Sequence, residues 1–331
     1  MDGVPQETVY LLKLELAGFP APDLYRAAGY ALVTGLAGPW RAPVVLKPNV
    51  VLRFAPDSGI ITHPAFVGGM VEALLAQGLS PAEIIVAEGG GIESDHDMAS
   101  IYADAGYTAE FARLDIELRD LNRDAYVISV DPSRQVLKNL YISRTIMEAG
   151  TLFNVAKMKA HNFATVTLTV KNMQGMLTPI QHRHLCTHYP RHDGDDGVGL
   201  DLRVVDEAPR FYQKLVDLAL AMRPAWHVIE GIVARDGTGF NRGKNVPLGL
   251  VLAGRNPFAV DHVGAYLMGF ASEEVGFLRA AVARGVWSFD ASGITVLAWH
   301  RGTWIPCPEW MAYRANPPLE LIKREDVKYQ E

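Results

Sequence analysis

Residues 151–175 read TLFNVAKMKAHNFATVTLTVKNMQG, and we start from this stretch because it combines strongly apolar and cationic sequence. The apolar run 152–156 predicts a buried β-strand. The strand pattern continues through three polar residues that alternate with apolar ones: Lys157, Lys159 and His161. Because alternate residues of a strand share a face, we expect these three side chains to point the same way.

The second half of the stretch repeats this combination. An apolar run at 166–170 leads into Lys171, Asn172 and, three residues later, Gly175. Cationic side chains beside apolar sequence are costly to bury unless an anion meets them. The stretch therefore predicts one wall of a site for a phosphate or a carboxylate.

Bulk properties exclude several classes of protein. The chain has 331 residues, 49% hydrophobic and 21% charged, which is typical of a globular protein with a substantial core. Its formal net charge of −6 argues against a nucleic-acid partner. Its two cysteines, Cys186 and Cys307, exclude a disulfide framework and an iron–sulfur cluster with four cysteine ligands from one chain.

The sequence also gives expectations about location. The first ten residues, MDGVPQETVY, lack the basic segment and apolar run of a signal peptide. No apolar run approaches the roughly 18 residues that cross a bilayer. We therefore predict a cytoplasmic protein with no membrane partner, and the sequence is compatible with a homo-oligomer.

Strand and helix patterns alternate over the first 90 residues. Strands are expected at 9–16, 44–46 and 84–87, with helices at 23–36 and from Pro64, capped by Thr62, to about residue 77. This order predicts an α/β fold with a mostly parallel, doubly wound, Rossmann-like sheet and helices on both faces. Ligands of such sheets bind at the carboxyl ends of strands, where Lys47 and Glu88 would lie.

The pattern continues to the C-terminal region. We expect further strands at 126–130, 227–233 and 246–253, a last strand at 294–299, and helices at 98–105, 142–149, 202–222, 257–268 and 273–284. Residues 1–310 would form one α/β domain, which can divide into lobes at 1–150 and 151–310. Residues 311–331 are expected to be an irregular tail.

Six short motifs resemble the DUF362 family, which is named for having no assigned function. They span residues 9 to 270 and are Lys47-Pro48-Asn49, Thr62-x-Pro64, Lys157-x-Lys159-x-His161, Thr167-x3-Lys171-Asn172-x2-Gly175, the Gly-rich turn after the Glu230 strand, and Asn256-Pro257-Phe-Ala-Val-Asp261. The resemblance implies an α/β fold and little about the reaction. A more distant, fold-level likeness is to the α/β half of nickel-pincer lactate racemases.

This sequence departs from the family pattern at three points. Many family members carry a cysteine-rich, ferredoxin-like segment, whereas this chain has no CxxC motif, so an iron–sulfur cluster is not expected. Glu230 stands where the family pattern suggests aspartate, and Gly239-Phe240 stands where it suggests Gly-Pro. No visible motif encodes a redox cofactor.

The leading hypothesis is an enzyme that acts on an anionic small molecule, phosphorylated or carboxylated, by isomerisation, elimination or group transfer. His161, Lys159 and Asp236 are the candidate acid–base residues. The candidate substrate-binding residues are Lys47, Asn49, Glu88, Lys157, Lys171 and Asn172. The three glycines after Glu88 would let backbone N–H groups approach the anion, although a tight turn is the alternative explanation.

The alternative hypothesis is a metal- or cofactor-binding accessory protein. The segment 182–196 contains His182, His184, His188 and His192, with aspartates nearby. Histidine and aspartate together suit a divalent metal ion, although Pro190 prevents one regular helix from presenting all four histidines. A polar loop with solvated histidines explains the same pattern without a metal.

Overall fold

Strand β7 (Thr151–His161) is the long strand predicted from the opening stretch, and it lies near the centre of the main sheet. The structure is a computed structural model that describes residues 6–36, 38–91, 97–178, 208–323 and 326. Every residue of β7 is buried, including its two lysines and its histidine. Phe153 and Val155 face the core on the α1 and α2 side, whereas Met158 faces the opposite core. The odd-numbered residues of β7 therefore share one face, as the alternation predicts.

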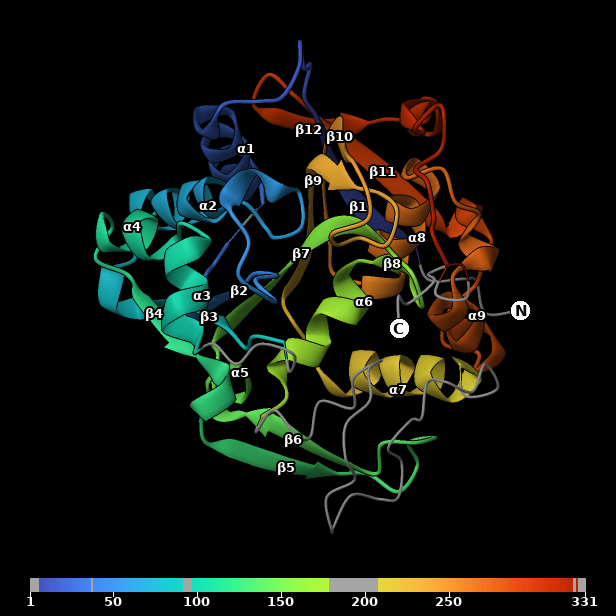
Figure 1. Cartoon of the computed structure of the whole chain (residues 1–331), viewed down its shortest axis with the longest axis horizontal. Coiled ribbons are helices and arrows are strands. Elements are labelled where there is room, and N and C mark those ends of the chain that lie inside the picture. The colour runs from blue at the N-terminus through green and yellow to red at the C-terminus, as the bar shows by residue number, and fades with distance from the viewer. Residues whose placement is uncertain (1–5, 37, 92–96, 179–207, 324–325, 327–331) are drawn as a thin grey trace.

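The main sheet has ten strands, with the order β12-β11-β1-β10-β9-β7-β2-β3-β4 and β8 paired to β7 (Figure 1). Besides β7, its strands are β1 (Glu7–Lys13), β2 (Val44–Lys47), β3 (Ile84–Glu88), β4 (Glu117–Asp120), β8 (Thr165–Thr167), β9 (Trp226–Arg235), β10 (Asn245–Gly254), β11 (Ile294–His300) and β12 (Thr303–Pro306). Of these, β8, β10 and β12 run opposite to the others. The predicted mostly parallel sheet is confirmed.

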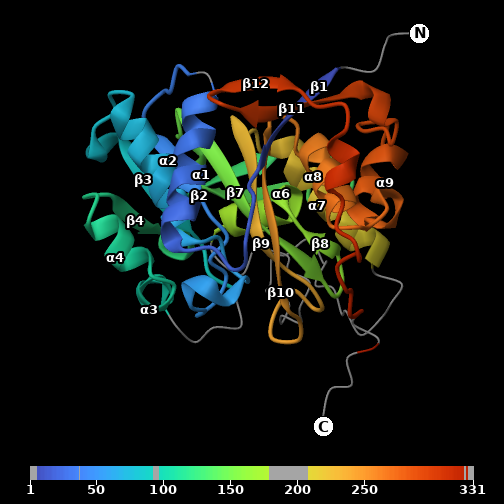
Figure 2. The same ribbon diagram turned by 90° about the horizontal axis from the view of Figure 1, so that it is seen from above.

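Helices cover both faces of this sheet, so the doubly wound arrangement is also confirmed. One face carries α1 (Pro22–Gly35), α2 (Pro64–Ala76), α3 (Met98–Asp104) and α4 (Tyr107–Ala112). The other carries α6 (Thr169–Asn172), α7 (Ala208–Ala221), α8 (Pro257–Leu267) and α9 (Gly276–Ala283). Figures 1 and 2 show α1 and α2 on one side of the sheet and α8 and α9 on the other.

The strand order reverses between β2 and β7. From β2 the chain passes through α2 to β3 and then to β4, whereas β7 and β9 lie on the opposite side of β2. Such a reversal opens a crevice at the carboxyl ends of the two strands that flank it. Lys47 is the last residue of β2 and pairs with Asn154 in β7, which continues beyond this register to His161.

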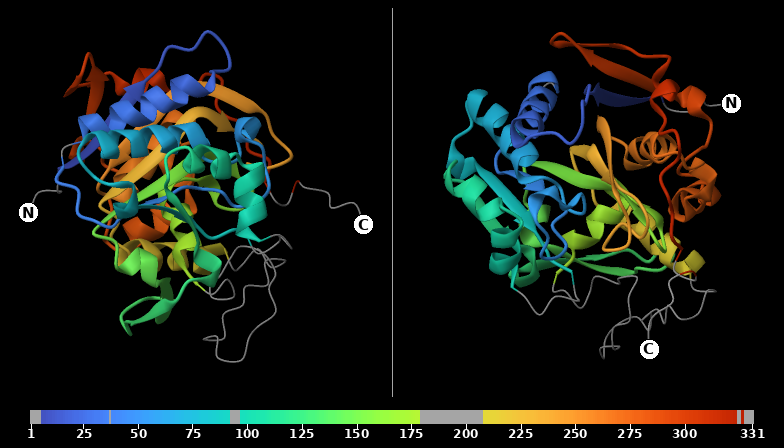
Figure 3. Two further views of the ribbon diagram at one scale, coloured as in Figure 1. Left: turned by 90° about the vertical axis from the view of Figure 1, so that its left-hand side faces the viewer. Right: turned by 45° about the horizontal axis from the view of Figure 1, so that its top comes forward.

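Several expected elements differ in the structure. Residues 142–149 are not one helix, because β6 (Asn139–Ser143) alternates inward side chains and Ser143 then caps the short helix α5 (Arg144–Met147). β6 pairs with β5 (Tyr126–Val130) in a separate ribbon, drawn green at the bottom of Figures 1 and 3, so β5 does not extend the main sheet. β12 follows the strand that was expected to be the last, and β4 and α4 were not predicted.

One local expectation also needs correction. The cap of α2 is His63 rather than Thr62, since the Nδ1 atom of His63 accepts the N–H of Ala65. The region after residue 310 contacts the body: the N–H groups of Ala315 and Leu319 donate to carbonyls at the end of α8.

Candidate functional site

Lys47 forms a buried ion pair at the end of β2. Its Nζ atom lies 2.8 Å from Oε1 of Glu88, at the end of the neighbouring strand β3, and the two side chains are 1% and 2% exposed. Glu88 also accepts the N–H groups of Val50 and Gly89. A buried charge needs such a partner and such hydrogen bonds. Lys47 and Glu88 therefore neutralise each other in the wall of the site.

A chain of side-chain amides runs from Lys47 across the crevice. Lys47 Nζ and Asn49 Nδ2 both donate to Oδ1 of Asn172, at 3.2 and 3.0 Å. Asn172 Nδ2 donates to Asn154 Oδ1 at 2.8 Å, and Asn154 Nδ2 donates to the carbonyl of Thr169, also at 2.8 Å. We call this set of four side chains, Lys47, Asn49, Asn172 and Asn154, the amide relay. It joins β2, β7 and α6 at the crevice.

The relay ends beside a neutral histidine. The Nδ2 atom of Asn154 lies 3.2 Å from Nδ1 of His227 on β9. Burial lowers the pKa of His227 to about 3, so its ring is neutral at neutral pH. The unprotonated Nδ1 then accepts from Asn154, and the relay contains no charge apart from the Lys47 ammonium.

Lys157 and Lys159 have different surroundings although they are two residues apart. Lys157 forms a buried ion pair with Glu230, its cross-strand neighbour on β9. Lys159 donates to the carbonyl of Ile60 at 3.0 Å, and no carboxylate of the described residues lies within ion-pair distance of its Nζ. A register shift in the β7–β9 pairing between the two lysines accompanies this change of partner.

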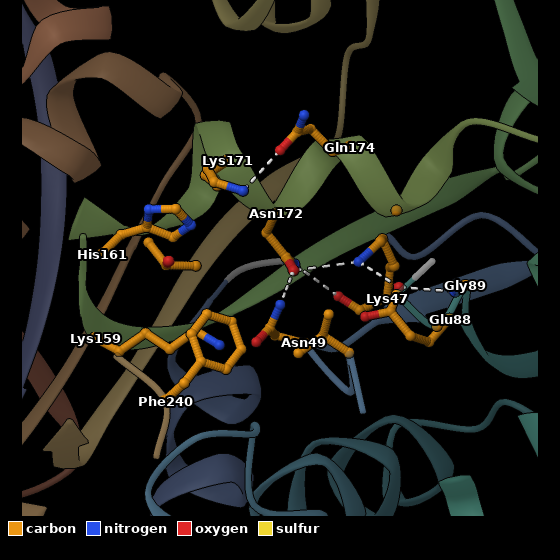
Figure 4. A pocket seen from close by; sticks show the side chains of 15 residues that line it. Lys47, Asn49, Glu88, Gly89, Lys159, His161, Lys171, Asn172, Gln174 and Phe240 are labelled. Atoms are coloured by element: carbon orange, nitrogen blue, oxygen red, sulfur yellow. Dashed lines mark hydrogen bonds and ion pairs between the residues drawn. The ribbon is translucent and has the colours of Figure 1, made fainter. Parts of the chain in front are cut away.

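The side chain of Phe240 covers Lys159. The Nζ atom lies 4.4 Å from the centre of the Phe240 ring, and the lysine is 1% exposed (Figure 4). Burial, together with the charges of Lys171 and Lys157, lowers the pKa of Lys159 to about 7. This amine can therefore gain or lose a proton near neutral pH.

Helix α6 brings Lys171 and Asn172 to the pocket, so these residues continue the opening stretch on a helix rather than on a strand. The carboxylate of Asp261 accepts the N–H groups of Thr169 and Val170 at the start of α6, at 2.8 and 2.9 Å. Burial raises the pKa of Asp261 to about 7. Lys171 Nζ donates to Gln174 Oε1 at 2.8 Å and, among the described residues, has no carboxylate within ion-pair distance.

The ring of His161 is held in one orientation. Its Nδ1 atom accepts the N–H groups of Phe163 and Ala164, each at 3.1 Å. In the neutral ring the proton is therefore on Nε2. Nε2–H is the group through which the neutral ring of His161 can donate a hydrogen bond.

These side chains line one pocket, shown in Figure 4, with a volume of about 500 Å³ that includes open solvent. Its lining residues are Lys47, Asn49, Val51, Glu88, Gly89, Gly90, Gly91, Lys159, His161, Thr167, Lys171, Asn172, Gln174, Gly175 and Phe240. A Cβ atom at Gly175 would lie 2.5 Å from Glu88 Oε1 and 2.9 Å from Lys47 Cε, so a side chain there would displace the buried ion pair. The crevice at the strand reversal is thus a lysine-lined pocket.

The glycines after Glu88 form a turn with internal hydrogen bonds. The N–H groups of Gly89, Gly90 and Gly91 point to Glu88 Oε1, Met98 Sδ and the Val51 carbonyl respectively. Each of these three N–H groups therefore already has an acceptor within the protein. This arrangement fits the tight-turn explanation better than a phosphate cradle.

Seven of the nine described candidate residues line the pocket, and two do not. Lys157 pairs with Glu230, as described above. Asp236 lies in the turn between β9 and β10, where its carboxylate accepts the N–H of Lys244.

The candidate metal ligands His182, His184 and His188 fall in 179–207, outside the described residues. Within the part of the chain that the structure describes, no three His, Cys, Asp or Glu side chains are placed to hold a metal ion.

Three contributors to the site were not named from the sequence, Val51, Asn154 and Gln174, and two more, Thr167 and Phe240, were quoted there only within family motifs. Thr167 and Gln174 lie within residues 151–175, four residues before and three residues after Lys171. This spacing could have indicated that both residues lie near the site. Asn154 is a polar residue inside an apolar run, and a buried amide of this kind requires partners. Phe240 is close only through the long β9–β10 turn, and sequence spacing gives no sign of it.

The protein is thus of the α/β class, with a lysine-lined pocket at the point where the order of its parallel strands reverses. The chain belongs to the DUF362 family, described as a domain of unknown function, because residues 44–266 match that family. The family predicted from six short motifs is confirmed.

Three known proteins are similar to this chain. A thylakoid-associated protein of Synechocystis sp. is 26% identical over 220 residues, which are 66% of this chain and 61% of that protein. The lactate racemase apoprotein from Thermoanaerobacterium thermosaccharolyticum aligns at 15% identity with a TM-score of 0.42, over 76% of this chain and 55% of that one. A Thermotoga maritima protein aligns at 12% identity with a TM-score of 0.39, over 70% and 55%. The chain thus spans about three fifths of the relative's length.

None of the helices in the described residues combines the length and the apolar character that crossing a membrane requires.

Proposed function

We propose that this protein is an enzyme that acts on an anionic small molecule, carboxylated or phosphorylated, bound in the lysine-lined pocket. One observation carries the proposal: Lys159 and Lys171 both line the pocket, and neither has a carboxylate of the described residues within ion-pair distance. The positive charge of Lys171 lowers the pKa of Lys159. An anion between the two amines would relieve this repulsion.

The pocket residues have distinct roles in this proposal. Lys171 supplies a positive charge, while Lys159, whose pKa is about 7, holds the anion when protonated and accepts a proton when neutral. His161 donates from Nε2–H toward the ligand. Lys47 and Glu88 neutralise each other and hold the wall in place. A base such as neutral Lys159 and a hydrogen-bond donor such as His161, placed beside a bound anion, suit isomerisation, elimination or group transfer.

Anion-dependent thermal stabilisation tests the binding step. A ligand that binds only the folded state raises the melting temperature in proportion to the logarithm of its concentration. We expect sulfate, phosphate and small carboxylates to raise the melting temperature of the wild-type protein, and Lys159→Ala and Lys171→Ala to abolish this rise. Lys323→Ala, at a surface position outside the pocket, is the matched control and should keep it. Equal stabilisation of all four proteins would exclude this pocket as the anion site.

Catalysis needs a separate test. Anions that stabilise the protein would be incubated with it in deuterated buffer and followed by NMR for loss of substrate signal or for deuterium incorporation. Turnover that disappears with His161→Gln or Lys159→Met supports an enzyme. Binding without any chemical change in every stabilising anion would reduce the proposal to an anion-binding protein.

We also retain the cytoplasm as the proposed location. The similar Synechocystis protein is named as thylakoid-associated, so association with a membrane surface is the competing outcome. Fractionation of cells that produce this protein, with a salt wash of the membrane pellet, distinguishes the two.

A further inference from the structure

One buried acceptor in the pocket wall has no hydrogen-bond partner. Oδ1 of Asn49 is inaccessible to solvent and receives no hydrogen bond, although the same side chain donates through Nδ2 to Asn172. Asn49 is 9% exposed and lines the pocket. In Figure 4 its oxygen lies on the side of the amide that faces Phe240 and Lys159. Buried acceptors of this kind are rare because an unmade hydrogen bond is costly.

The orientation of the Asn49 amide is determined by the amide relay. At one end, the ammonium group of Lys47 can only donate, so Asn172 must present Oδ1 to it. At the other end, the carbonyl of Thr169 can only accept, so Asn154 must present Nδ2 to it and Oδ1 to Asn172. Asn172 is thereby fixed from both sides. Asn49, which meets the Oδ1 atom of Asn172, must use Nδ2 there and direct its own Oδ1 elsewhere.

We infer that the ligand of this pocket carries a hydroxyl group beside its anionic group, and that this hydroxyl donates to Oδ1 of Asn49. The inference rests on the proposed function and narrows the substrate class to hydroxylated carboxylates or phosphates. A ligand ammonium group could also donate, but it would lie in a pocket that already holds the amines of Lys159 and Lys171, whereas Lys47 is neutralised by Glu88. A neutral donor avoids that repulsion.

Because Oδ1 of Asn49 is inaccessible to solvent, a side chain that lines the pocket must move before a ligand reaches it, and we assign this movement to Phe240. Phe240 lines the pocket and covers Lys159. Its main chain is held, since its carbonyl accepts from Arg235 Nε at 2.9 Å and its N–H donates to Thr238 Oγ1 at 3.3 Å. The ring of Phe240 can therefore rotate while the main chain of the turn keeps its hydrogen bonds.

Two matched pairs of anions test the inference. Butyrate is compared with 2,3-dihydroxybutyrate, and propyl phosphate with glycerol 1-phosphate, by calorimetric titration of the full chain. In at least one pair we expect the hydroxylated anion to bind about ten-fold tighter or more, because a buried acceptor discriminates strongly against a ligand that leaves it unpaired. The pair that shows the difference also separates carboxylates from phosphates.

A substitution locates the effect at Asn49. In Asn49→Ala, the ratio of affinities within the responding pair should fall to about one, while Asn139→Ala, at an exposed position of β6, should keep the wild-type ratio. A ratio that persists in Asn49→Ala overturns the inference. If Asn49→Ala does not fold, the wild-type ratios still decide, because equal affinity within both pairs also overturns it.

The outcomes separate this inference from the proposed function. Equal binding within both pairs leaves the anion site intact and removes the hydroxyl requirement. Absence of binding by all four anions at millimolar concentration overturns the proposed function and this inference together.

Discussion

The ammonium group of Lys159 lies over the ring of Phe240, 4.4 Å from its centre, and the ring separates this amine from solvent. The burial that the ring provides contributes to the low pKa of Lys159, because desolvation is the largest cause of that shift. One aromatic side chain on the β9–β10 turn thus influences both the accessibility and the protonation of a lysine on β7.

We predict that Phe240→Ala raises the pKa of Lys159 from about 7 toward the ordinary lysine value, because water then reaches the ammonium group. NMR titration of the lysine side-chain carbons would measure the change. Phe289→Ala, at a ring that contacts His262 and does not line the pocket, is the control. A pKa of Lys159 that stays near 7 in Phe240→Ala would show that the other lysines, rather than burial under this ring, set it.

Sulfate binding should depend on pH through Lys159. Sulfate does not titrate between pH 6 and 9, and it favours the protonated amine, so its affinity is full below about pH 7 and falls as the pH rises above that value. The decrease approaches about ten-fold per pH unit where Lys159 is neutral in the free protein and protonated in the complex. Lys159→Arg stays charged and should give a nearly flat profile. A flat wild-type profile in calorimetric titrations would contradict this prediction.

Lys157→Met should mainly lower stability, whereas Lys159→Met should mainly remove sulfate binding. Lys157→Met leaves Glu230 buried without its cation, which is expected to lower the free energy of unfolding by about 3–5 kcal/mol while leaving sulfate affinity within about two-fold. Lys159→Met removes an amine that has no nearby carboxylate among the described residues, so stability should not fall but sulfate binding should be lost. Urea unfolding and calorimetry measure the two effects. Equal losses of sulfate binding would place both lysines in the anion site.

The sequence predicted the common face of these lysines but not their different partners. Alternation along β7 is a local property, and it was sufficient to place Lys159 and His161 at one pocket. Glu230 follows Lys157 by more than 70 residues and becomes its neighbour only through the pairing of β9 with β7. No spacing rule could identify that carboxylate as the partner of Lys157 rather than of Lys159.

Contacts between residues far apart in the sequence also explain where other predictions differ from the structure. Lys47, Glu88 and Asn172 were identified because strand ends and short motifs mark them. The helix expected at 142–149 was wrong because Ile142 and its neighbours carry apolar residues at spacings that suit both structures, and pairing with β5 selected the strand. Asp261 appeared in the sequence only as part of a family motif, and its contact with the N–H groups at the start of α6 depends on the packing of α8 beside that helix.

Asp261 should matter for ligand binding although it does not line the pocket. Asp261→Ala leaves the N–H groups of Thr169 and Val170 without their acceptor, which is expected to destabilise the fold by about 1–3 kcal/mol. Sulfate affinity should also fall, since α6 carries Lys171. Asp261→Asn keeps one acceptor oxygen and should lie between the two in both measurements. Unchanged sulfate affinity in folded Asp261→Ala would show that α6 keeps its position without this cap.

Gly175→Ala should disrupt the pocket wall. The new methyl group would lie 2.5 Å from Glu88 Oε1 and 2.9 Å from Lys47 Cε, so the ion pair must shift. We expect a loss of stability of about 1–3 kcal/mol, as for other overpacked sites, together with weaker sulfate binding. Gly18→Ala has nothing within 4 Å of the new methyl group and is the matched control. Wild-type behaviour of Gly175→Ala in thermal unfolding and calorimetry would contradict the tight packing of this wall.

The orientation of each amide in the amide relay, and so which atom donates and which accepts, is fixed independently from both ends of the relay. The Lys47 ammonium group specifies it from β2, and the main-chain carbonyl of Thr169 specifies it independently from the start of α6. If Lys47 were replaced by a neutral side chain, the carbonyl would still orient Asn154, then Asn172 and finally Asn49. Two independent contacts therefore determine that Asn49 presents its oxygen to the pocket. A substitution that removes the Lys47 charge would weaken the wall, but Asn49 would still accept a hydrogen bond from the ligand.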